Sequence, residues 1–148
     1  MKISIITVCY NNINGLERTF ESVKKIKSAF SESIDFEWII VDGGSTDGTV
    51  SYLQEKSKAI DYWISENDTG IYNAMNKGIS IANGDYYIFM NSGDIFSEEL
   101  FESQLDNELE GGYELIYGNV ISVDENNNKT QIIQSKSLNK DFFVGNTL

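Results

Sequence analysis

Three polar segments follow hydrophobic, β-branched stretches of the sequence, and they carry the side chains best suited to chemistry. They are residues 9–11, a loop over 42–49 that opens with Asp42, and residues 91–94, which end in Asp94. The chain has no His, the commonest general base and metal ligand, so acid–base and metal chemistry must fall to Asp and Glu. A carboxylate such as Asp94 can hold Mg²⁺ or Mn²⁺ when substrate phosphates complete the coordination shell.

The same side chains also have a purely structural interpretation. In the loop Asp-Gly-Gly-Ser-Thr-Asp-Gly-Thr, Asp and Ser can cap a helix and Gly can supply positive φ. Asp94 can equally be a turn residue or a helix cap. Two kinds of nucleotide site lack their motifs. The dinucleotide-binding motif G-x-G-x-x-G does not follow the first hydrophobic stretch, and the P-loop motif G-x-x-x-x-G-K-[ST] does not occur in the chain. A phosphoaspartyl nucleophile would more usually have a second Asp at position 44, which is Gly44.

Hydrophobic periodicity predicts how these segments are positioned. Strand patterns alternate with helix patterns, which favours an α/β fold with a mostly parallel sheet flanked by helices. The predicted strands are 3–8, 36–41, 61–65 and 85–90, with antiparallel additions near the C-terminal end at 115–117, 120–123 and 130–133. Four helices are predicted. The first begins at an Asn14 N-cap with Glu17 three residues later, and the second includes Val50 and Leu53. The third occupies 70–82, and the fourth begins at Ser97. Ligands bind beyond the carboxyl ends of parallel strands, so the three polar segments should converge on one rim.

Composition narrows the function classes. A chain of 148 residues fits one domain, and its 11 basic and 23 acidic residues give a net charge of −12. This charge argues against a nucleic-acid partner and against docking on an anionic membrane. A phosphate ester would be repelled unless a cation or oriented backbone amides intervened. With one Cys and no apolar run approaching ~20 residues, we expect a cytoplasmic protein, with peripheral association at the inner face of the membrane left open.

Four segments, in this order and spacing, resemble the family 2 glycosyltransferases, which have the GT-A fold. They are residues 3–11, Val-Asp-Gly-Gly-Ser-Thr-Asp-Gly-Thr at 41–49, Glu-Asn-Asp-Thr-Gly-Ile-Tyr-Asn-Ala-Met-Asn-Lys-Gly at 66–78, and 84–94. The resemblance extends from residue 3 to about residue 123. It implies transfer of a sugar from a nucleotide-diphosphate donor, with a UDP-sugar favoured, to a hydroxyl of a glycan or lipid-linked acceptor. It also implies inversion, Mg²⁺ or Mn²⁺, and a role in polysaccharide or surface-glycan synthesis.

The resemblance assigns roles to particular side chains. Val8, Cys9 and Tyr10 would lie against the nucleotide base, and Asp42 would contact the uracil or ribose. Asp68 and the helix that carries Asn76 would approach the ribose and diphosphate. Ser92 stands where the family's D-x-D metal motif has its first Asp, and Asp94 would be the final, metal-binding Asp of that motif.

The sequence departs from the family pattern at three positions. Val8 replaces a frequent Pro. Gly43 replaces the second Asp of the common Asp-Asp-Gly-Ser loop, which leaves the contact with the base and the identity of the nucleotide open. Ser92 leaves Asp94 as the only carboxylate of the metal motif, so we expect weaker metal affinity.

The catalytic base is not identified. An inverting transfer needs a carboxylate base here, which the family places well downstream of the metal motif. Asp124, Glu125 and Asp141 are available but match no motif. We therefore predict that residues 1–148 form a single GT-A domain without its acceptor-binding part, prone to self-association through apolar residues 142–144. Two alternatives remain open: a non-catalytic nucleotide-sugar-binding or interaction fragment, and, less favoured, a nucleotidyltransferase, because residues 11–16 contain no Lys or Arg.

Overall fold

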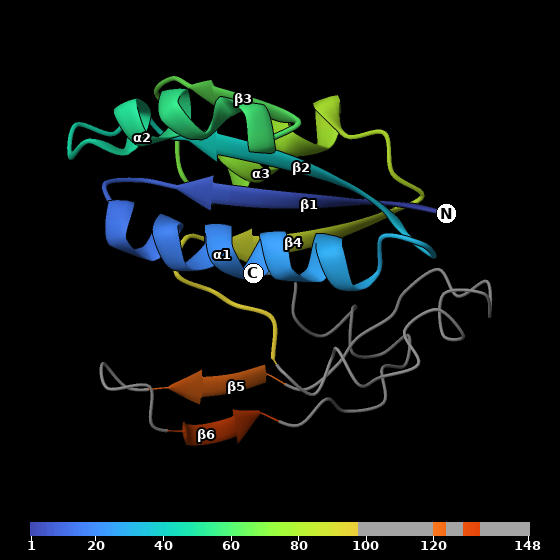
Figure 1. Cartoon of the computed structure of the whole chain (residues 1–148). Coiled ribbons are helices and arrows are strands. Elements are labelled where there is room, and N and C mark those ends of the chain that lie inside the picture. The colour runs from blue at the N-terminus through green and yellow to red at the C-terminus, as the bar shows by residue number, and fades with distance from the viewer. Residues whose placement is uncertain (98–119, 124–128, 134–148) are drawn as a thin grey trace, which may run out of the picture. The chain divides into compact units, whose positions relative to one another are not determined.

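The computed structural model describes residues 1–97, 120–123 and 129–133 (Figure 1). The chain divides into two compact units, Met1–Ser103 and Gln104–Leu148, and each is considered by itself. The first unit contains a four-stranded sheet in the order β3-β2-β1-β4. Its strands are β1 (Lys2–Cys9), β2 (Asp35–Asp42), β3 (Tyr62–Ser65) and β4 (Tyr86–Asn91).

All neighbouring strands of this sheet are parallel, as the alternating pattern predicted. Their register aligns the strand ends, because Cys9 pairs with Asp42 and Asp42 pairs with Ser65. Val8 pairs with Asn91 on the other side of β1. The segments that follow β1, β2, β3 and β4 therefore leave the sheet at one edge, which confirms the predicted rim.

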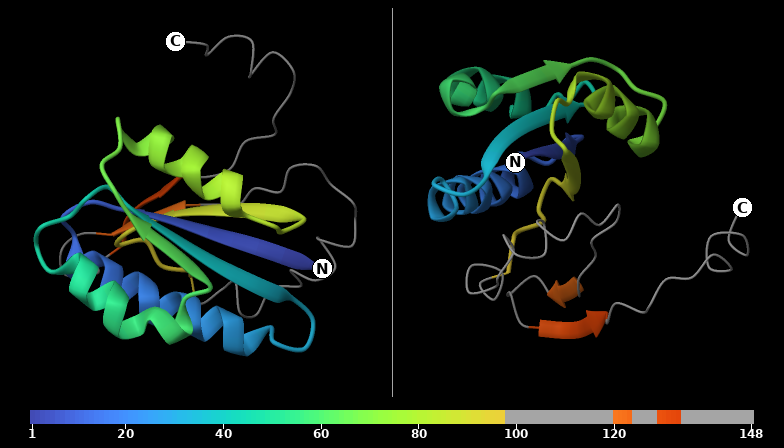
Figure 2. Two further views of the ribbon diagram at one scale, coloured as in Figure 1. Left: turned by 90° about the horizontal axis from the view of Figure 1, so that it is seen from above. Right: turned by 90° about the vertical axis from the view of Figure 1, so that its right-hand side faces the viewer.

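Helices cover both faces of the sheet. α1 (Ile13–Ala29) and α2 (Thr49–Lys56) lie on one face and α3 (Ile71–Ile81) on the other, while a short 3-10 turn, η1 (Ser57–Ala59), follows α2 (Figure 2). On the first face the Phe20 ring packs 5.3 Å from Trp38 and 5.9 Å from Tyr52 of α2, measured between centroids. The buried Trp38 indole donates to Thr7 Oγ1 at 2.9 Å, so its polar atom is satisfied within the core.

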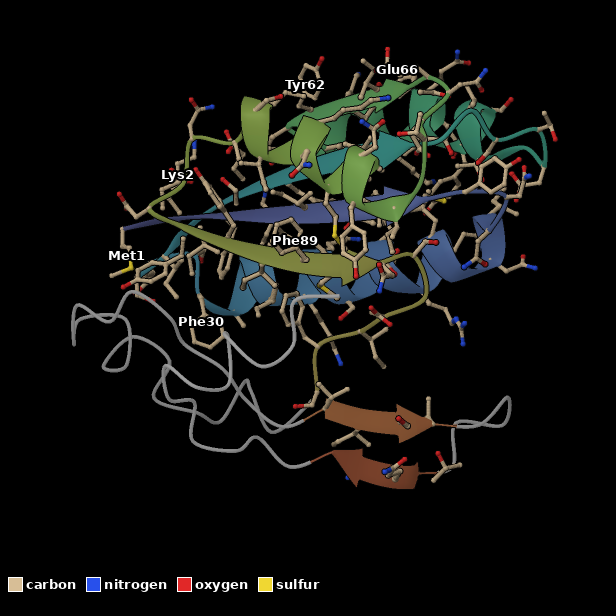
Figure 3. The ribbon with its side chains drawn as sticks, turned by 180° about the vertical axis from the view of Figure 1, so that it is seen from behind. Met1, Lys2, Phe30, Tyr62, Glu66 and Phe89 are labelled. Atoms are coloured by element: carbon tan, nitrogen blue, oxygen red, sulfur yellow. The ribbon has the colours of Figure 1, made fainter. Side chains whose placement is uncertain are left out.

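On the second face, α3 packs over β1 and β2. Its buried residues are Ala74 and Gly78, and a Cβ at Gly78 would collide with the Ile6 side chain, so the glycine allows close helix–strand approach. The predicted apolar series of this helix is only partly buried, because Ile71 is 48% and Ile79 37% exposed. Beyond the helix, Phe89 lies on the exposed face of β4 (Figure 3).

A polar network joins the amino ends of β1 and β2 to the turn before β4. The Glu37 carboxylate accepts from Ser4 Oγ at 2.7 Å, Lys2 Nζ at 3.1 Å and Asn83 N at 2.9 Å. Burial tends to raise the pKa of Glu37, but the hydrogen bonds from Asn83, Ser4 and Lys2 outweigh it and lower the pKa to about 2. This network lies at the opposite end of the strands from the rim and is structural.

One helix boundary differs from the prediction. Asn12, not Asn14, caps α1: its side chain accepts from Gly15 N at 3.1 Å, and Asn14 lies in the first helical turn. The predicted Asn14–Glu17 capping pair is therefore wrong. The predicted helix after Ser97 and the predicted strand 115–117 lie outside the described residues.

Within the second unit, β5 (Val120–Val123) and β6 (Lys129–Ile133) pair antiparallel. Thr130 Oγ1 donates across the pair to Ser122 O at 3.1 Å. The late antiparallel addition is thus confirmed. Asp124 and Glu125 in the connection, and also Asp141 and residues 142–144, lie outside the described residues. In the described part of the chain, no helix has the length and apolar character to cross a membrane.

Candidate functional site

Four loops lie side by side at the carboxyl edge of the parallel sheet. Main-chain hydrogen bonds join them directly beyond the strands: Gly43 N to Cys9 O at 2.9 Å, Ser92 N to Val8 O at 2.9 Å, and Glu66 N to Asp42 O at 3.0 Å. These bonds extend the strand pairing into the loops. The loops over 9–12, 42–49, 66–70 and 91–94 therefore form one continuous rim.

Asn11 fastens the first loop to the second. It has a left-handed backbone, φ 47°, a conformation that Asn tolerates better than most residues. Its main-chain N donates to Ser45 Oγ at 2.7 Å, and its side-chain Oδ1 accepts from Thr46 N at 2.8 Å. The loop after β1 thus holds the loop after β2 in place.

Asn12 fastens the first loop to the last. While its Oδ1 caps α1, its Nδ2 donates to Ser92 O at 2.9 Å and to Ser92 Oγ at 3.1 Å. Thr19 of α1 completes the attachment, since its hydroxyl donates to Asp94 O at 2.9 Å and accepts from Gly93 N at 2.9 Å. The turn after β4 is therefore positioned by α1.

Asp42 is fully buried, and its carboxylate organises its own loop. It accepts from Gly44 N at 3.2 Å, from Ser45 N at 2.9 Å and from Ser65 Oγ of β3 at 2.6 Å, as well as from the Ser45 hydroxyl. This is the structural role that the sequence left open for this residue. Its predicted contact with a uracil or ribose stays a prediction.

Asp47 is a second organising carboxylate, which the sequence analysis missed. It accepts from Ile13 N at 2.9 Å and from Thr49 Oγ1 at 2.6 Å, and so joins the first turns of α1 and α2. The hydrogen bond from the Thr49 hydroxyl is the main cause of a pKa below the usual range for Asp47. An Asp two residues before a Thr that begins a helix is a recognisable capping pattern.

Tyr10 is the one side chain of the predicted base-contacting trio that is open to solvent. It is 66% exposed, whereas Val8 is 7% and Cys9 5% exposed. Burial raises the pKa of the Cys9 thiol. The predicted contacts of a nucleotide base with Val8 and Cys9 stay predictions. Because these two side chains are buried, the exposed Tyr10 ring is the apolar surface of the three that a ligand can reach.

Asp68 lies beside Tyr10, although the two belong to different loops. A Cβ built on Gly43 would lie 2.8 Å from Asp68 Oδ2 and 3.3 Å from Tyr10 Cδ2, so the three residues surround one small space. Asp68 Oδ1 accepts from Gly70 N at 2.9 Å just before α3.

The rest of this loop is tied to α3 through Lys77. Lys77 Nζ lies 2.8 Å from Glu66 Oε1 and 3.0 Å from Asn67 O. Asn76, the neighbouring residue of α3, is exposed. Its predicted approach to the diphosphate stays a prediction.

Asp94 is exposed in the turn after β4, and Ser92 in the same turn is half-buried. Asp94 Oδ2 accepts from Asn91 N at 3.0 Å, which is the turn-stabilising role considered in the sequence analysis. Among residues 1–97 and the two described strands beyond them, no three Cys, Asp or Glu side chains cluster as a metal site. An exposed single carboxylate fits a cation held jointly with substrate phosphates rather than a protein-only cage.

Solved structures share this fold. The first 349 residues of TarS from S. aureus, in complex with UDP-GlcNAc, match 69% of this chain with a TM-score of 0.56, at 24% identity and over 29% of that chain. The mannosyltransferase PcManGT from Pyrobaculum calidifontis, in complex with GDP-Man and Mn²⁺, matches 83% of this chain with a TM-score of 0.61, at 19% identity and over 35% of that chain. The fold is therefore the GT-A glycosyltransferase fold, as predicted.

Sequence comparison defines the family. The model of glycosyl transferase family 2 matches residues 4–146, and the chain belongs to this family. An uncharacterized glycosyltransferase of Mycobacterium tuberculosis is 42% identical over 95 residues, 64% of this chain and 35% of the relative. The putative teichuronic acid biosynthesis glycosyltransferase TuaG of Bacillus subtilis is 36% identical over 108 residues, 70% of this chain and 40% of the relative. The chain thus spans well under half the length of these two relatives.

Proposed function

We propose that this chain binds the nucleotide-diphosphate sugar donor of a glycosyltransferase, with a UDP-sugar favoured, in the synthesis of a polysaccharide or surface glycan. The observation that carries the proposal is the joined rim, where exposed Tyr10, half-buried Asp68 and exposed Asp94 come from three different loops of one parallel sheet. In such sheets, ligands bind beyond the carboxyl ends of the strands. The UDP-GlcNAc and GDP-Man complexes of the TarS and PcManGT structures support the same ligand class.

In this proposal Asp94 is the residue of this chain that holds Mg²⁺ or Mn²⁺. The cation would neutralise the diphosphate and stabilise charge on the departing nucleoside diphosphate. The chain's own contribution is positional, because Thr19 and Asn12 fix the turn that carries Asp94. The net charge of −12 disfavours the approach of a diphosphate, and a bound cation would offset this repulsion.

The acceptor and the catalytic base stay unassigned. We propose that a carboxylate takes the proton from a hydroxyl of a glycan or lipid-linked acceptor, and that this oxygen attacks the anomeric carbon of the donor sugar with inversion, displacing the nucleoside diphosphate. Asp124, Glu125 and Asp141 are the candidate carboxylates within residues 1–148.

Titration calorimetry with UDP and GDP, each with and without Mn²⁺, tests donor binding. We expect UDP to bind in the presence of Mn²⁺ and to stabilise the fold by about 2.7 kcal/mol at 100 times Kd. Asp94→Asn should abolish the Mn²⁺ dependence and leave the fold intact, because an Asn side-chain oxygen can still accept from Asn91 N. Glu55→Gln, on the exposed surface of α2, is the matched control for loss of one negative charge.

Two results would contradict the proposal. A folded wild-type chain that binds no nucleoside diphosphate with any divalent cation would exclude donor binding. An Asp94→Asn variant that keeps full Mn²⁺ dependence would place the cation elsewhere and leave Asp94 with only its turn role.

A further inference from the structure

Two Asn-Gly pairs occur in the sequence, at positions 14–15 and 83–84. In such a pair the main-chain N of the glycine can attack the side-chain carbonyl carbon of the asparagine, because glycine has no side chain to hinder the approach. Asn is one of the thermolabile residues of proteins. In a folded chain the reaction also depends on the main chain around each pair, and the two pairs differ in this respect.

The first pair lies in the first turn of α1. Gly15 N donates to Asn12 Oδ1 at 3.1 Å, and Leu16 N donates to Asn12 O at 2.9 Å. To close a ring between the Asn14 side chain and Gly15 N, the main chain would have to leave the helical conformation and break these two hydrogen bonds. The helix therefore protects Asn14.

The second pair lies in the turn between α3 and β4. The main chain has already left the helical conformation at Ala82, where ψ is 139°. Asn83 is exposed and lies outside the helix and the strand. Rotation of the main chain between Asn83 and Gly84 therefore breaks no helical hydrogen bond.

The packing of this turn requires both residues of the second pair. A Cβ at Gly84 would lie 2.6 Å from Ser4 N and 2.9 Å from Tyr86 O, and these are main-chain atoms of the sheet that cannot move aside. Asn83 donates to the Glu37 carboxylate twice, from its main-chain N at 2.9 Å and from Nδ2 at 3.3 Å. The fold thus imposes a chemically unstable dipeptide at this position.

We propose that Asn83 is a site of spontaneous deamidation in the folded chain, and that the Ser4 hydroxyl controls its rate. Gly84 N donates to Ser4 Oγ at 2.9 Å, and this hydrogen bond must break before the nitrogen can attack Asn83 Cγ. Because the site lies at the opposite end of the strands from the rim, this inference does not depend on donor binding.

The reaction needs only water and hydroxide. Gly84 N gives its proton to hydroxide and forms a bond to Asn83 Cγ, which closes a five-membered succinimide ring. The bond between Cγ and Nδ2 breaks, and the amide nitrogen takes a proton from water and leaves as ammonia. Water then opens the ring to give either aspartate at position 83 or isoaspartate, in which the main chain runs through Cβ and Cγ.

The product acts on the network around Glu37. The new carboxylate no longer donates to Glu37 Oε1, and it places a second negative charge beside the first. Glu37 also accepts from Ser4 of β1 and from Lys2, so the network joins β1, β2 and the turn before β4. Deamidation should therefore lower the stability of the sheet at its amino end.

Peptide mass spectrometry of the folded chain, kept over time in mildly alkaline buffer, tests the inference. We expect conversion at position 83 to be about fivefold or more faster than at position 14, where two hydrogen bonds oppose the reaction. In guanidinium chloride both positions should react at similar rates, which shows that the difference comes from the fold. Ser4→Ala should accelerate conversion at position 83 by about 2–10-fold and leave position 14 unchanged.

The effect of the product is measured with Asn83→Asp. Its Tm should fall below that of wild type, and Glu37→Gln should lower Tm less in this background than in wild type, because the two carboxylates repel each other. Asn14→Asp is the matched control. It adds the same charge at the other Asn-Gly pair, where the N-terminus of α1 favours a carboxylate, and should not lower Tm.

Two results would overturn the inference: no conversion at position 83 of the folded chain while the unfolded chain reacts, or equal rates at positions 14 and 83 of the folded chain. A folded Ser4→Ala variant that reacts at the wild-type rate would overturn the control by Ser4. If melting curves show that Ser4→Ala does not fold, amide hydrogen exchange of the wild type decides this point, since an unprotected Gly84 N–H would exclude that control.

Discussion

Replacing Asn12 by Ala should remove two structural functions at once. The side chain caps α1 through Gly15 N and holds the turn after β4 through two hydrogen bonds to Ser92. Loss of an N-cap costs about 0.5–2 kcal/mol, and each neutral hydrogen bond about 0.5–1.5 kcal/mol. We therefore expect Asn12→Ala to lower the free energy of unfolding by about 1.5–5 kcal/mol.

Two further variants separate these functions. Asn12→Asp supplies a carboxylate oxygen that can still accept from Gly15 N, and its negative charge is favoured at a helix N-terminus. It loses the side-chain N–H groups that donate to Ser92 O and Ser92 Oγ. It should retain most of the stability and loosen the turn that carries Asp94. Gly15→Ala works from the other side, because its Cβ would collide with the Asn12 side-chain amide. It should be destabilising despite the better helix propensity of Ala, worth about 1 kcal/mol.

Urea unfolding followed by the fluorescence of buried Trp38 measures these differences, with equal m-values as the check that the states compared are unchanged. Mn²⁺-dependent UDP binding then reports on the turn. An Asn12→Ala variant that loses less than 0.5 kcal/mol would refute the cap and the turn anchor together. Equal stability losses in Asn12→Asp and Asn12→Ala would show that capping contributes little.

Three other predictions follow from the described contacts. The pKa of Glu37 is lowered from 4.5 to about 2 in the folded state. The ionised Glu37 carboxylate therefore stabilises the fold fully above pH 4.5, and this contribution disappears as the pH falls toward 2. The difference in Tm between wild type and Glu37→Gln should narrow over the same pH range. Gly78→Ala should destabilise by about 1–3 kcal/mol in urea unfolding, because the added methyl group meets Ile6. Ser65→Ala removes a donor from buried Asp42 and should cost about 1–3 kcal/mol, whereas wild-type stability would mean that the loop donors suffice.

The two central strands, β1 and β2, could be predicted because they are long and mostly apolar. Residues 3–8 and 36–41 lie between helices on both faces, and such doubly buried strands leave a continuous hydrophobic pattern. The boundary of α1 could not be predicted in the same way. Asn12 and Asn14 are the same residue type, and Gly15, which Asn12 caps, has no side chain to mark a capping box. The exposure of Ile71 and Ile79 could not be predicted either, because hydrophobic periodicity does not show how many strands a helix covers.

The rim could be predicted, but not which of its side chains face solvent. The resemblance predicts ligand contacts for Asp42 and Asp68 and assigns none to Asp47. In the structure, Asp42 and Asp47 hold the loops together by accepting hydrogen bonds from Ser45 N, from Ser65 Oγ of β3 and from Ile13 N of α1. Such hydrogen bonds depend on residues brought together by folding, and a sequence pattern does not reveal them.

The two departures from the family's acidic motifs each have a partner in the structure. A Cβ at position 43 would lie 2.8 Å from Asp68 Oδ2, so a side chain there would displace the Asp68 carboxylate, and Ser92 accepts two hydrogen bonds from Asn12 Nδ2. An Asp at position 92 would place a charge where a hydroxyl now accepts from an amide that also positions α1. Substitution of either position therefore changes the environment of its partner, so restoring the family residue at 43 or 92 alone should not restore the family's site. We expect the changes in the free energy of unfolding to be non-additive for two substitutions within the pair 43/68 or within the pair 12/92. Substitutions in different pairs should be additive to the extent that the pairs share no contacts.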